Sequence, residues 1–454
     1  MRLFGTNGVR GVVNDDLTVE LAVKLGKAIG LYFNGKVAIA TDTRNSGGMI
    51  KSAVASGLMA LGADVVDIGV TPTPALQFFT GTHDDVKGGV MITASHNPPQ
   101  FNGIKCVGPT GRELIRCEEE RIEEFYAADI KSRPWDSVGT ISYDGSATEN
   151  YVNAVVKHVD SEAIRKAGLT AVIDCVNGAS CGSAPMLLSK LGVRAIALNT
   201  TPQGIPEHLS EPTEDNLKDL MEKTRSSNAD IGVAHDGDAD RAVFIDNLGK
   251  FVSGDKSLSI MSKHVLSRKK GLVVTPVSSS SMVEDVVKQA GGTIMYTAVG
   301  SPTVAKAMLD HNAIFGGEEN GGLIFPEHQL CRDGAMTVAK MLECIAKEGP
   351  LSEQVSKLPE YHVEKRKIDC PNECKCGLLD HLSSFGKGAR TDRTDGLKMI
   401  YDDGWVLVRP SGTEPKFRIY SESKIKEVAV KRADDTERIA TEYMRTISGR
   451  THSN

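Results

Sequence analysis

Three aspartates, Asp236, Asp238 and Asp240, alternate in one short loop between two apolar runs that resemble strands. Carboxylates this close repel one another unless a cation neutralises them, and a hard divalent ion is the natural candidate. Mg²⁺ prefers few carboxylates, with substrate oxygens completing its octahedral shell. We therefore predict a Mg²⁺ site on these residues, with a solvated acidic hairpin as the structural alternative.

Arg241 follows the third aspartate directly. Counted from Asp236, it occupies the sixth position, where an EF-hand loop needs glycine, and Asn247 occupies the twelfth, where that loop needs glutamate. The pattern therefore excludes an EF-hand calcium site. Transfer of a phosphoryl group depends on cations more than on covalent help, so an arginine beside a metal indicates this chemistry.

A second loop carries a hydroxyl group. The stretch VMITASHNPP begins as a buried strand and continues through Ser95 and His96 to two prolines. Serine at neutral pH is a poor nucleophile unless a base takes its proton or the oxygen is already derivatised. Ser95 is not in a GxSxG elbow, and the adjacent His96 need not reach its hydroxyl, so an esterase is not indicated. Taken alone, the loop fits a capped turn as well as a reactive serine. Lys105, further along the sequence, adds a cation.

Two further loops offer polar groups to a ligand. In GGEENGG, carboxylates can accept hydrogen bonds from sugar hydroxyls, and the glycines allow close approach. In RPSGTEP, a guanidinium, two hydroxyls and turn amides lie among prolines, which is typical of a preorganised phosphate cradle. A surface turn and a plain hairpin are the respective alternatives. The predicted binding residues are Glu318, Asn320, Arg409, Ser411, Gly412 and Thr413.

Three segments of the sequence share the same order of secondary-structure elements. These elements must position the loops described above. Each has a short apolar strand, a small polar turn, an amphipathic helix followed by glycine, and a second strand. Connections this short imply parallel pairing through a right-handed crossover, so each segment predicts an α/β layer with ligands beyond the carboxyl ends of its strands. The predicted strand, helix and strand cover 37–40, 56–61 and 65–68; 170–174, 184–191 and 193–198; and 272–275, 282–289 and 293–296.

The pattern changes after residue 362, where we expect a smaller α+β domain. Its expected elements are an outlying strand, a helix near 378–384, strands near 398–401, 405–409 and 417–421, and a long polar helix to the end. The fold class is therefore α/β, with three similar domains and a C-terminal α+β domain. The expected domain limits are 1–147 for the serine loop, 148–250 for the metal loop, 251–362 for the sugar loop and 363–454 for the phosphate loop.

Cysteine usage indicates a reducing compartment. Nine cysteines at irregular spacing fit reduced thiols better than a disulfide framework. Cys370, Cys374 and Cys376 lie close enough in sequence to bind zinc, but CxxxCxC is not a usual spacing and a fourth ligand is not evident. We predict instead that a helix begins after Pro371.

Composition bounds the partners. The 454 residues are 40% hydrophobic and 25% charged, with a net charge of −6, which is typical of a soluble enzyme. No block of Lys and Arg exceeds 268–270, so we expect neither nucleic acid nor a membrane surface as a partner. Because a signal peptide and a long apolar run are lacking, the expected compartment is the cytoplasm. Nothing in the sequence decides between a monomer and a homo-oligomer.

The four loops together resemble the signatures of the α-D-phosphohexomutase family. TASHNP, DGDAD followed by Arg, GEENGG and RPSGTEP occur in the family's order and span nearly the whole chain. The opening FGTNGVRG, from Phe4 to Gly11, is similar to the phosphoglucosamine mutases within that family, and GEENGG is similar to its archaeal branch. The resemblance implies three related mixed-sheet α/β domains and a fourth domain around a central cleft, with one loop from each.

The resemblance also implies a mechanism. Ser95 would carry a phosphoryl group and exchange it with a hexose or hexosamine 6-phosphate or 1-phosphate through a sugar bisphosphate. Arg10, Lys105 and Arg241 would surround the transferring group, with Lys105 as the proton shuttle because arginine does not deprotonate. His96 would orient the loop. The implied ligands of Mg²⁺ are Ser95, through its phosphoryl oxygen, Asp236, Asp238 and Asp240.

Two departures and three alternatives accompany this interpretation. Gly322 and Ser301 stand where some family members have histidine, which leaves the general base open. The nearest alternative to a glucosamine phosphate mutase is a phosphomannomutase/phosphoglucomutase of dual specificity. The different-class alternatives are a phosphatase that uses Asp236 as nucleophile and a non-catalytic sugar-phosphate sensor.

Overall fold

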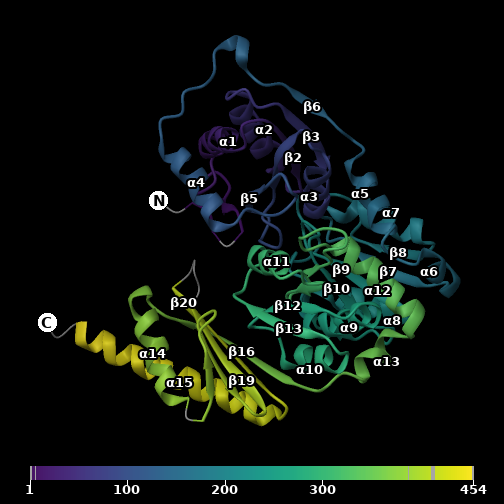
Figure 1. Ribbon diagram of the computed structural model, residues 1–454, viewed down its shortest axis with the longest axis vertical. Helices are drawn as coiled ribbons and strands as arrows, with labels where there is room; N and C mark the ends of the chain where they lie inside the picture. Colours follow the sequence, from purple (N-terminus) through teal and green to yellow (C-terminus); the bar gives the residue numbers. More distant parts are fainter. Residues whose placement is uncertain (1–2, 6, 387, 411–414, 452–454) are drawn as a thin grey trace.

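The computed structural model describes residues 3–451 except 6, 387 and 411–414 (Figure 1). Within these residues the strands form four sheets, which follow one another in chain order. The first three sheets mix parallel and antiparallel pairs, whereas the fourth is antiparallel throughout. This arrangement confirms the prediction of three mixed-sheet α/β domains and a C-terminal α+β domain.

The first sheet has the strand order β1-β5-β4-β2-β3-β6. Its strands are β1 (Val9–Val12), β2 (Lys36–Thr41), β3 (Val65–Val70), β4 (Val86–Ile92), β5 (Phe101–Val107) and β6 (Ile141–Tyr143). The accompanying helices are α1 (Val19–Phe33), α2 (Gly47–Met59), α3 (Thr73–Thr82), α4 (Arg116–Ala127) and the 3-10 helix η1 (Trp135–Ser137). Strand β2 pairs in parallel with both β3 and β4, and β4 then pairs antiparallel with β5.

The second and third sheets repeat this core, with orders β11-β10-β9-β7-β8 and β13-β12-β14-β15. The second domain contains α5 (Ala147–Val156), α6 (Ser161–Ala167), β7 (Thr170–Asp174), α7 (Ser180–Leu191), β8 (Arg194–Leu198), η2 (Glu214–Leu217), α8 (Lys218–Ser226), β9 (Ile231–His235), β10 (Ala242–Ile245) and β11 (Phe251–Val252). The third contains α9 (Gly254–Arg268), β12 (Leu272–Pro276), α10 (Ser281–Gln289), β13 (Thr293–Thr297), α11 (Ser301–Asp310), β14 (Phe315–Gly317), β15 (Leu323–Ile324), α12 (Gly334–Glu348) and α13 (Leu351–Ser356).

The predicted strand–helix–strand segments therefore exist, and their strands pair in parallel as expected. Local chemistry sets the helix ends. Helix α7 stops at Gly192, which adopts a left-handed φ of 73°, and α10 begins after Ser280, whose side chain accepts the Met282 N–H. Helix α7 starts at Ser180, earlier than predicted. Helix α2 runs from Gly47 to Met59, so it begins well before residue 56 and ends before residue 61.

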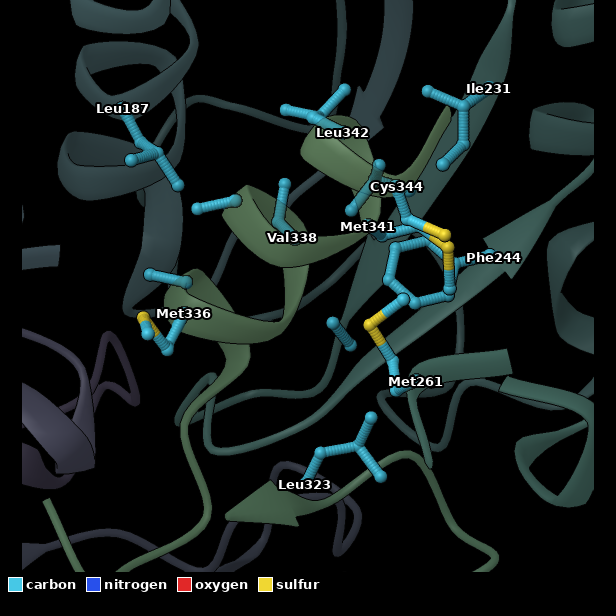
Figure 2. Packing of buried hydrophobic residues seen from close by; sticks show 14 of the residues in the cluster. Leu187, Ile231, Phe244, Met261, Leu323, Met336, Val338, Met341, Leu342 and Cys344 are labelled. Atoms are coloured by element: carbon cyan, nitrogen blue, oxygen red, sulfur yellow. The ribbon is translucent and has the colours of Figure 1, made fainter. Parts of the chain in front are cut away.

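The second and third domains share one hydrophobic core. Helix α12 is buried on all sides from Gly334 to Ile345. Figure 2 shows its side chains between Leu187 of α7 on one side and Phe244 of β10 and Met261 of α9 on the other. Because helix α12 fills the space between the two α/β layers, the second and third domains pack together as one unit.

The C-terminal domain has the sheet order β16-β20-β19-β18-β17. Its elements are β16 (His362–Asp369), η3 (Asn372–Cys374), α14 (Lys375–Phe385), β17 (Arg390–Asp392), β18 (Leu397–Tyr401), β19 (Gly404–Pro410), β20 (Lys416–Ser423) and α15 (Lys426–Thr451). It docks on the third domain, where Lys398 Nζ donates to the Val277 carbonyl (2.6 Å) and Trp405 packs against Val277. In Figure 1 this domain extends away from the first.

The cysteine cluster of this domain belongs to its core. Helical structure begins after Pro371, as predicted. Cys370 and Cys374 lie in the hydrophobic core of the domain, whereas Cys376 is exposed. The three thiols therefore face different surroundings, and within the described residues they do not converge as a group of metal ligands.

The domain limits given above stay predictions, with one proposed adjustment. Strand β11 pairs with β10 and extends the second sheet to Val252. We therefore propose that the third domain begins after Val252 rather than at residue 251. In the described part of the chain, no helix combines the length and apolar character needed to span a bilayer.

Candidate active site

Each of the four sequence motifs joins two neighbouring antiparallel strands. The serine loop (93–100) joins β4 to β5, and the metal loop (236–241) joins β9 to β10. The sugar loop (318–322) joins β14 to β15, and the phosphate loop (411–415) joins β19 to β20. In the first three domains the strand before the loop belongs to the parallel part of the sheet, so the loop lies at the carboxyl edge expected for ligands.

The metal loop brings three carboxylates together. Oxygens of Asp236, Asp238 and Asp240 lie within 4.8 Å of one another, and all three residues are buried. Asp238 Oδ1 and Asp240 Oδ1 have no hydrogen-bond partner among the described residues. Buried oxygens are normally hydrogen-bonded, so two unpartnered carboxylate oxygens facing one cluster fit a hard divalent cation.

The three carboxyl groups are electrostatically unequal. Burial, together with the charges of Asp240 and Asp238, raises the pKa of Asp236 above its usual range. Burial alone would also raise the pKa of Asp238, but the Lys105 ammonium at 2.6 Å and the Thr73 hydroxyl at 2.7 Å outweigh it and lower that pKa. Without a cation, a proton on Asp236 therefore relieves the crowding, while Asp238 stays ionised.

Ser95 meets the metal loop across the boundary of the first and second domains. Its Oγ donates to Asp236 Oδ2 at 2.8 Å, and the residue is only 1% exposed. Its backbone adopts a left-handed φ of 52°, and its N–H donates to Thr93 Oγ1 (2.8 Å). A strained conformation held by local hydrogen bonds places the hydroxyl directly against a carboxylate.

His96 reaches Ser95, a contact that adjacency in the sequence did not by itself require. Its Nδ1 lies 3.2 Å from Ser95 Oγ and 3.3 Å from Arg241 Nη2, and its Nε2 lies 3.1 Å from Glu211 Oε2. Burial, then the charges of Arg241 and Arg10, lower the pKa of His96 to about 3. The imidazole is therefore neutral at pH 7, and an Nε2–H donated to Glu211 leaves Nδ1 as an acceptor.

Three cations surround the serine and the triad. Arg10 on β1 donates from Nη1 to Asn97 Oδ1 (2.6 Å), and Lys105 on β5 is fully buried beside Asp238. Arg241 places its Nε 3.7 Å from Asp236 Oδ2. The structure thus brings together the predicted residues of the first two loops, whose chemical roles remain predictions.

Arg44 is a residue of this site that the sequence analysis missed. Its Nη2 donates to the carbonyls of Ser95 (2.8 Å) and Asn97 (2.7 Å), and its Nη1 donates to that of Pro98 (2.8 Å). Asp42 holds the same guanidinium through Nε at 3.1 Å. The arginine therefore fixes the backbone of the serine loop. Its place in TDTRN, directly after a strand of the same sheet, was the available signal.

The sugar loop is tied to the metal loop by Arg332, another residue that the sequence analysis missed. Glu318 is buried and accepts from the Gly300 N–H (3.1 Å) and from Arg332 Nη1 (3.3 Å). Burial raises the pKa of Glu318, and Arg332 opposes this shift. Arg332 Nη2 also contacts Asp240 Oδ2. Asn320 is half-buried and accepts the Gly322 N–H at 3.0 Å, so the loop itself orients its amide.

The phosphate loop is only partly described. Ser411, Gly412 and Thr413 lie outside the described residues. Arg409 donates from Nε to Asp395 Oδ2 (2.6 Å), and the same oxygen accepts the Val299 N–H (3.0 Å). A continuous series of contacts therefore runs from Arg409 at the end of β19 through residues 299–300 and the sugar loop to the metal loop and Ser95. Ser301, at the same turn, donates to Glu113 of the first domain (2.6 Å).

A second group of potential metal ligands lies elsewhere, between α9 and α12. His264 Nδ1, Cys344 Sγ and a Glu348 oxygen also lie within 4.8 Å of one another. Here, however, the atoms are paired, because His264 Nδ1 lies 2.7 Å from Glu348 Oε1 and Cys344 Sγ donates to Gln354 Oε1 (3.2 Å).

Three repeated α/β layers whose loops converge on a serine beside an aspartate triad define the architecture of the phosphohexomutases. Family models of phosphoglucomutase/phosphomannomutase match the chain in four parts: α/β/α domain I at residues 1–133, domain II at 149–249, domain III at 253–361 and the C-terminal domain at 367–440. The chain therefore belongs to the phosphoglucomutase/phosphomannomutase family, and it is a phosphohexomutase, an isomerase.

Relatives agree with this assignment. A phosphoglucomutase/phosphomannomutase of Thermococcus kodakarensis is 44% identical over 94% of this chain and 96% of its own length. A phosphoglucosamine/phosphogalactosamine mutase of Sulfurisphaera tokodaii is 41% identical over 94% of this chain and 96% of its own. The crystal structure of a phosphoglucomutase/phosphomannomutase family protein from Burkholderia thailandensis superposes with a TM-score of 0.85 at 26% identity, covering 96% of this chain and 97% of that one.

Proposed function

We propose that this protein is a phosphoglucosamine mutase, which interconverts glucosamine 6-phosphate and glucosamine 1-phosphate through a phosphoserine at Ser95 and a bound bisphosphate. The observation that carries the proposal is the 2.8 Å contact between Ser95 Oγ and Asp236 inside a buried aspartate triad. A serine in this position can accept and return a phosphoryl group where negative charge is neutralised, which is what a reversible transfer needs.

The metal of this site is Mg²⁺ in our proposal, held by Asp236, Asp238, Asp240 and an oxygen of the phosphorylated Ser95. When bound, the ion neutralises charge on the transferring phosphoryl group. The all-oxygen ligand set and the two unpartnered carboxylate oxygens support a hard cation over a thiophilic one.

The protein groups around Ser95 have distinct roles in this proposal. Arg241 and Arg10 stabilise negative charge, since a guanidinium does not deprotonate. Lys105, buried beside Asp238, is the group that donates and recovers a proton at the sugar oxygen. Because its pKa is lowered to about 3, His96 is neutral at pH 7, and in this proposal it accepts from Arg241 through Nδ1 and orients the serine loop rather than acting as a base.

The sugar has to present either end to Ser95, so the remaining loops must bind it in two orientations. In this scheme Glu318 and Asn320 accept hydrogen bonds from the hydroxyl groups of the sugar. Arg409, with Ser411, Gly412 and Thr413, binds the phosphate that is not reacting, and a guanidinium suits this role because it binds phosphate oxygens in a bidentate manner.

The amino sugar is the least constrained part of the proposal. A carboxylate pair in the sugar loop can accept an ammonium group, and the Sulfurisphaera relative carries the name of a hexosamine phosphate mutase. The Thermococcus relative carries the name of a glucose and mannose phosphate mutase, so dual specificity for those sugars is the second candidate.

Intact-mass analysis and substrate assays test these points together. We expect one phosphoryl group on Ser95, its loss in Ser95→Ala, and turnover of glucosamine 6-phosphate in Mg²⁺ when a trace of the matching bisphosphate is added. If mannose or glucose phosphate is turned over as fast or faster, that sugar replaces glucosamine as the proposed substrate. Phosphate on Asp236 with full activity of Ser95→Ala would indicate an aspartate nucleophile, and tight binding without turnover would indicate a sensor.

A further inference from the structure

Arg332 lies between the two loops that meet at the active site. Its Nη2 contacts Asp240 Oδ2 of the metal loop, and its Nη1 donates to Glu318 Oε2 of the sugar loop at 3.3 Å. The side chain is 7% exposed, and its Nε has no hydrogen-bond partner among the described residues. A buried guanidinium with carboxylates from two domains at its ends forms a fixed connection between those domains.

Gly322 leaves the space that the stem of this arginine occupies. A Cβ built at position 322 would lie 2.3 Å from Arg332 Cδ and 3.0 Å from its Cγ. Contacts that short do not occur between real side chains, so any other residue at 322 forces Arg332 to move. The glycine is required here for space, because the backbone at 322 is not left-handed. A side chain at 322 and this placement of Arg332 therefore exclude each other.

The charge balance shows what Arg332 contributes. Lys105 lies 2.6 Å from Asp238 but 3.7 Å from Asp240, and Arg241 Nε lies 3.8 Å from Asp240 Oδ1. Asp240 therefore has its direct cation contact through Arg332. That contact uses Oδ2 and leaves Oδ1 as one of the two triad oxygens that have no hydrogen-bond partner among the described residues.

We infer that Arg332 is a positioning residue for the mutase reaction, which holds Asp240 for the metal and Glu318 for the sugar at the same time, and that Gly322 is present to admit it. The inference rests on the proposed function of the triad and the sugar loop. Groups that orient a metal ligand from outside the coordination shell commonly change metal affinity or activity when they are removed.

Four variants separate the charge of Arg332 from the space that it fills. Arg332→Met keeps the stem and removes the guanidinium, Arg332→Lys keeps one charge, and Arg332→Ala removes both. Gly322→Ala adds the colliding Cβ. Gly182→Ala is the matched control, because Gly182 has no neighbour within 4 Å of an added Cβ.

Mg²⁺ affinity, measured by calorimetric titration of metal-free protein, is the first readout, and it needs no substrate. We expect Arg332→Met and Arg332→Ala to weaken Mg²⁺ binding by about 10-fold to 100-fold, and to lower kcat/KM for the accepted sugar phosphate by a similar factor. Arg332→Lys should recover part of the Mg²⁺ affinity while KM stays raised, because an ammonium cannot span both carboxylates.

The combined variants test the spatial pairing. Gly322→Ala should weaken Mg²⁺ binding in the wild-type background and should have little further effect on Mg²⁺ affinity in Arg332→Ala, where the colliding Arg332 atoms are absent and only Asn320 Oδ1 remains near the added Cβ, at 3.1 Å. Strictly additive effects of the two changes, or Mg²⁺ affinity and kcat/KM of Arg332→Met within twofold of wild type, would overturn the inference. If the wild type binds Mg²⁺ but turns over no hexose phosphate, the proposed function fails and the affinity series still decides the role of Arg332.

Discussion

The aspartate triad and the His264–Cys344–Glu348 group both place three potential metal ligands within 4.8 Å, yet they are built differently. In the triad, two carboxylate oxygens are buried without a partner among the described residues. In the other group, His264 Nδ1 and Nε2 face Glu348 (2.7 Å) and Glu343 (3.5 Å), and the Cys344 thiol has its own acceptor.

The two groups differ in how the negative charge of their carboxylates is neutralised. The triad has three acids on one loop and contacts Lys105 and Arg332 from other segments and Arg241 from the loop itself. Two of its oxygens still have no hydrogen-bond partner among the described residues, so a further cation lowers its energy. In the second group, the hydrogen bonds that the His264 ring donates to Glu343 and Glu348 outweigh the effect of burial and raise the pKa of His264, which favours the imidazolium in that group. Ligand proximity therefore identifies a metal site only when some of the ligand atoms remain unpartnered.

The largest expected difference between the aspartate triad and the His264 group is the effect of a substitution on kcat/KM. Asp238→Asn is expected to lower kcat/KM by about 10³-fold, since it removes a charge that acts on the transferring group. Cys344→Ser, in the second group, should leave kcat/KM within twofold. Steady-state assays of both purified variants provide the check, and comparable losses in the two would contradict the comparison.

Removal of the imidazole should destabilise the protein without inactivating it. His264→Ala removes the imidazole from the buried Glu343 and the half-buried Glu348, while Glu343 keeps Arg268 at 2.6 Å, and is expected to cost about 2 kcal/mol of unfolding free energy. Calorimetric unfolding would show the loss as a lower transition temperature. Retained Mg²⁺ affinity is the control, and an unchanged transition would mean that the group contributes nothing to the α9–α12 contact.

Metal addition should stabilise the protein through the triad alone. At about 100 times its Kd, Mg²⁺ should add about 2.7 kcal/mol of stability, which EDTA reverses. The Asp240→Asn variant should lose this stabilisation, whereas His264→Ala should keep it. Thermal melts of the three proteins with and without Mg²⁺ measure the difference, and a metal response that requires His264 would reverse the assignment.

The pH dependence of the second group is the smallest effect and has a defined sign. A raised pKa of His264 in the folded state means that its contribution is complete below the unfolded value near 6.5 and is lost as pH rises through the folded pKa. The difference in stability between wild type and His264→Ala should therefore shrink above that pH. A difference that grows with pH would show that the histidine is buried in its neutral form.

The sequence by itself determined the repeated layers and the composition of the loops. Strand β7 coincides with the predicted 170–174, because a short apolar run followed by turn residues is a property of a short stretch of chain. The spacing of Asp236, Asp238 and Asp240 likewise predicted a cation site, because carboxylates two residues apart stay close together and repel one another. The predicted helix limits were less accurate for α7 and α2, where tertiary packing extended or shortened the helix.

Only the tertiary structure decided which distant groups meet. Ser95 contacts Asp236, 141 residues further on, because the carboxyl edges of two sheets face each other. The contacts of Arg44, Glu211 and Arg332 depend on sheet order and on the shared helix α12, and no local pattern encodes either. Spacing along the chain therefore identified the reactive groups, whereas the packing of the domains placed each beside the partner that sets its charge and orientation.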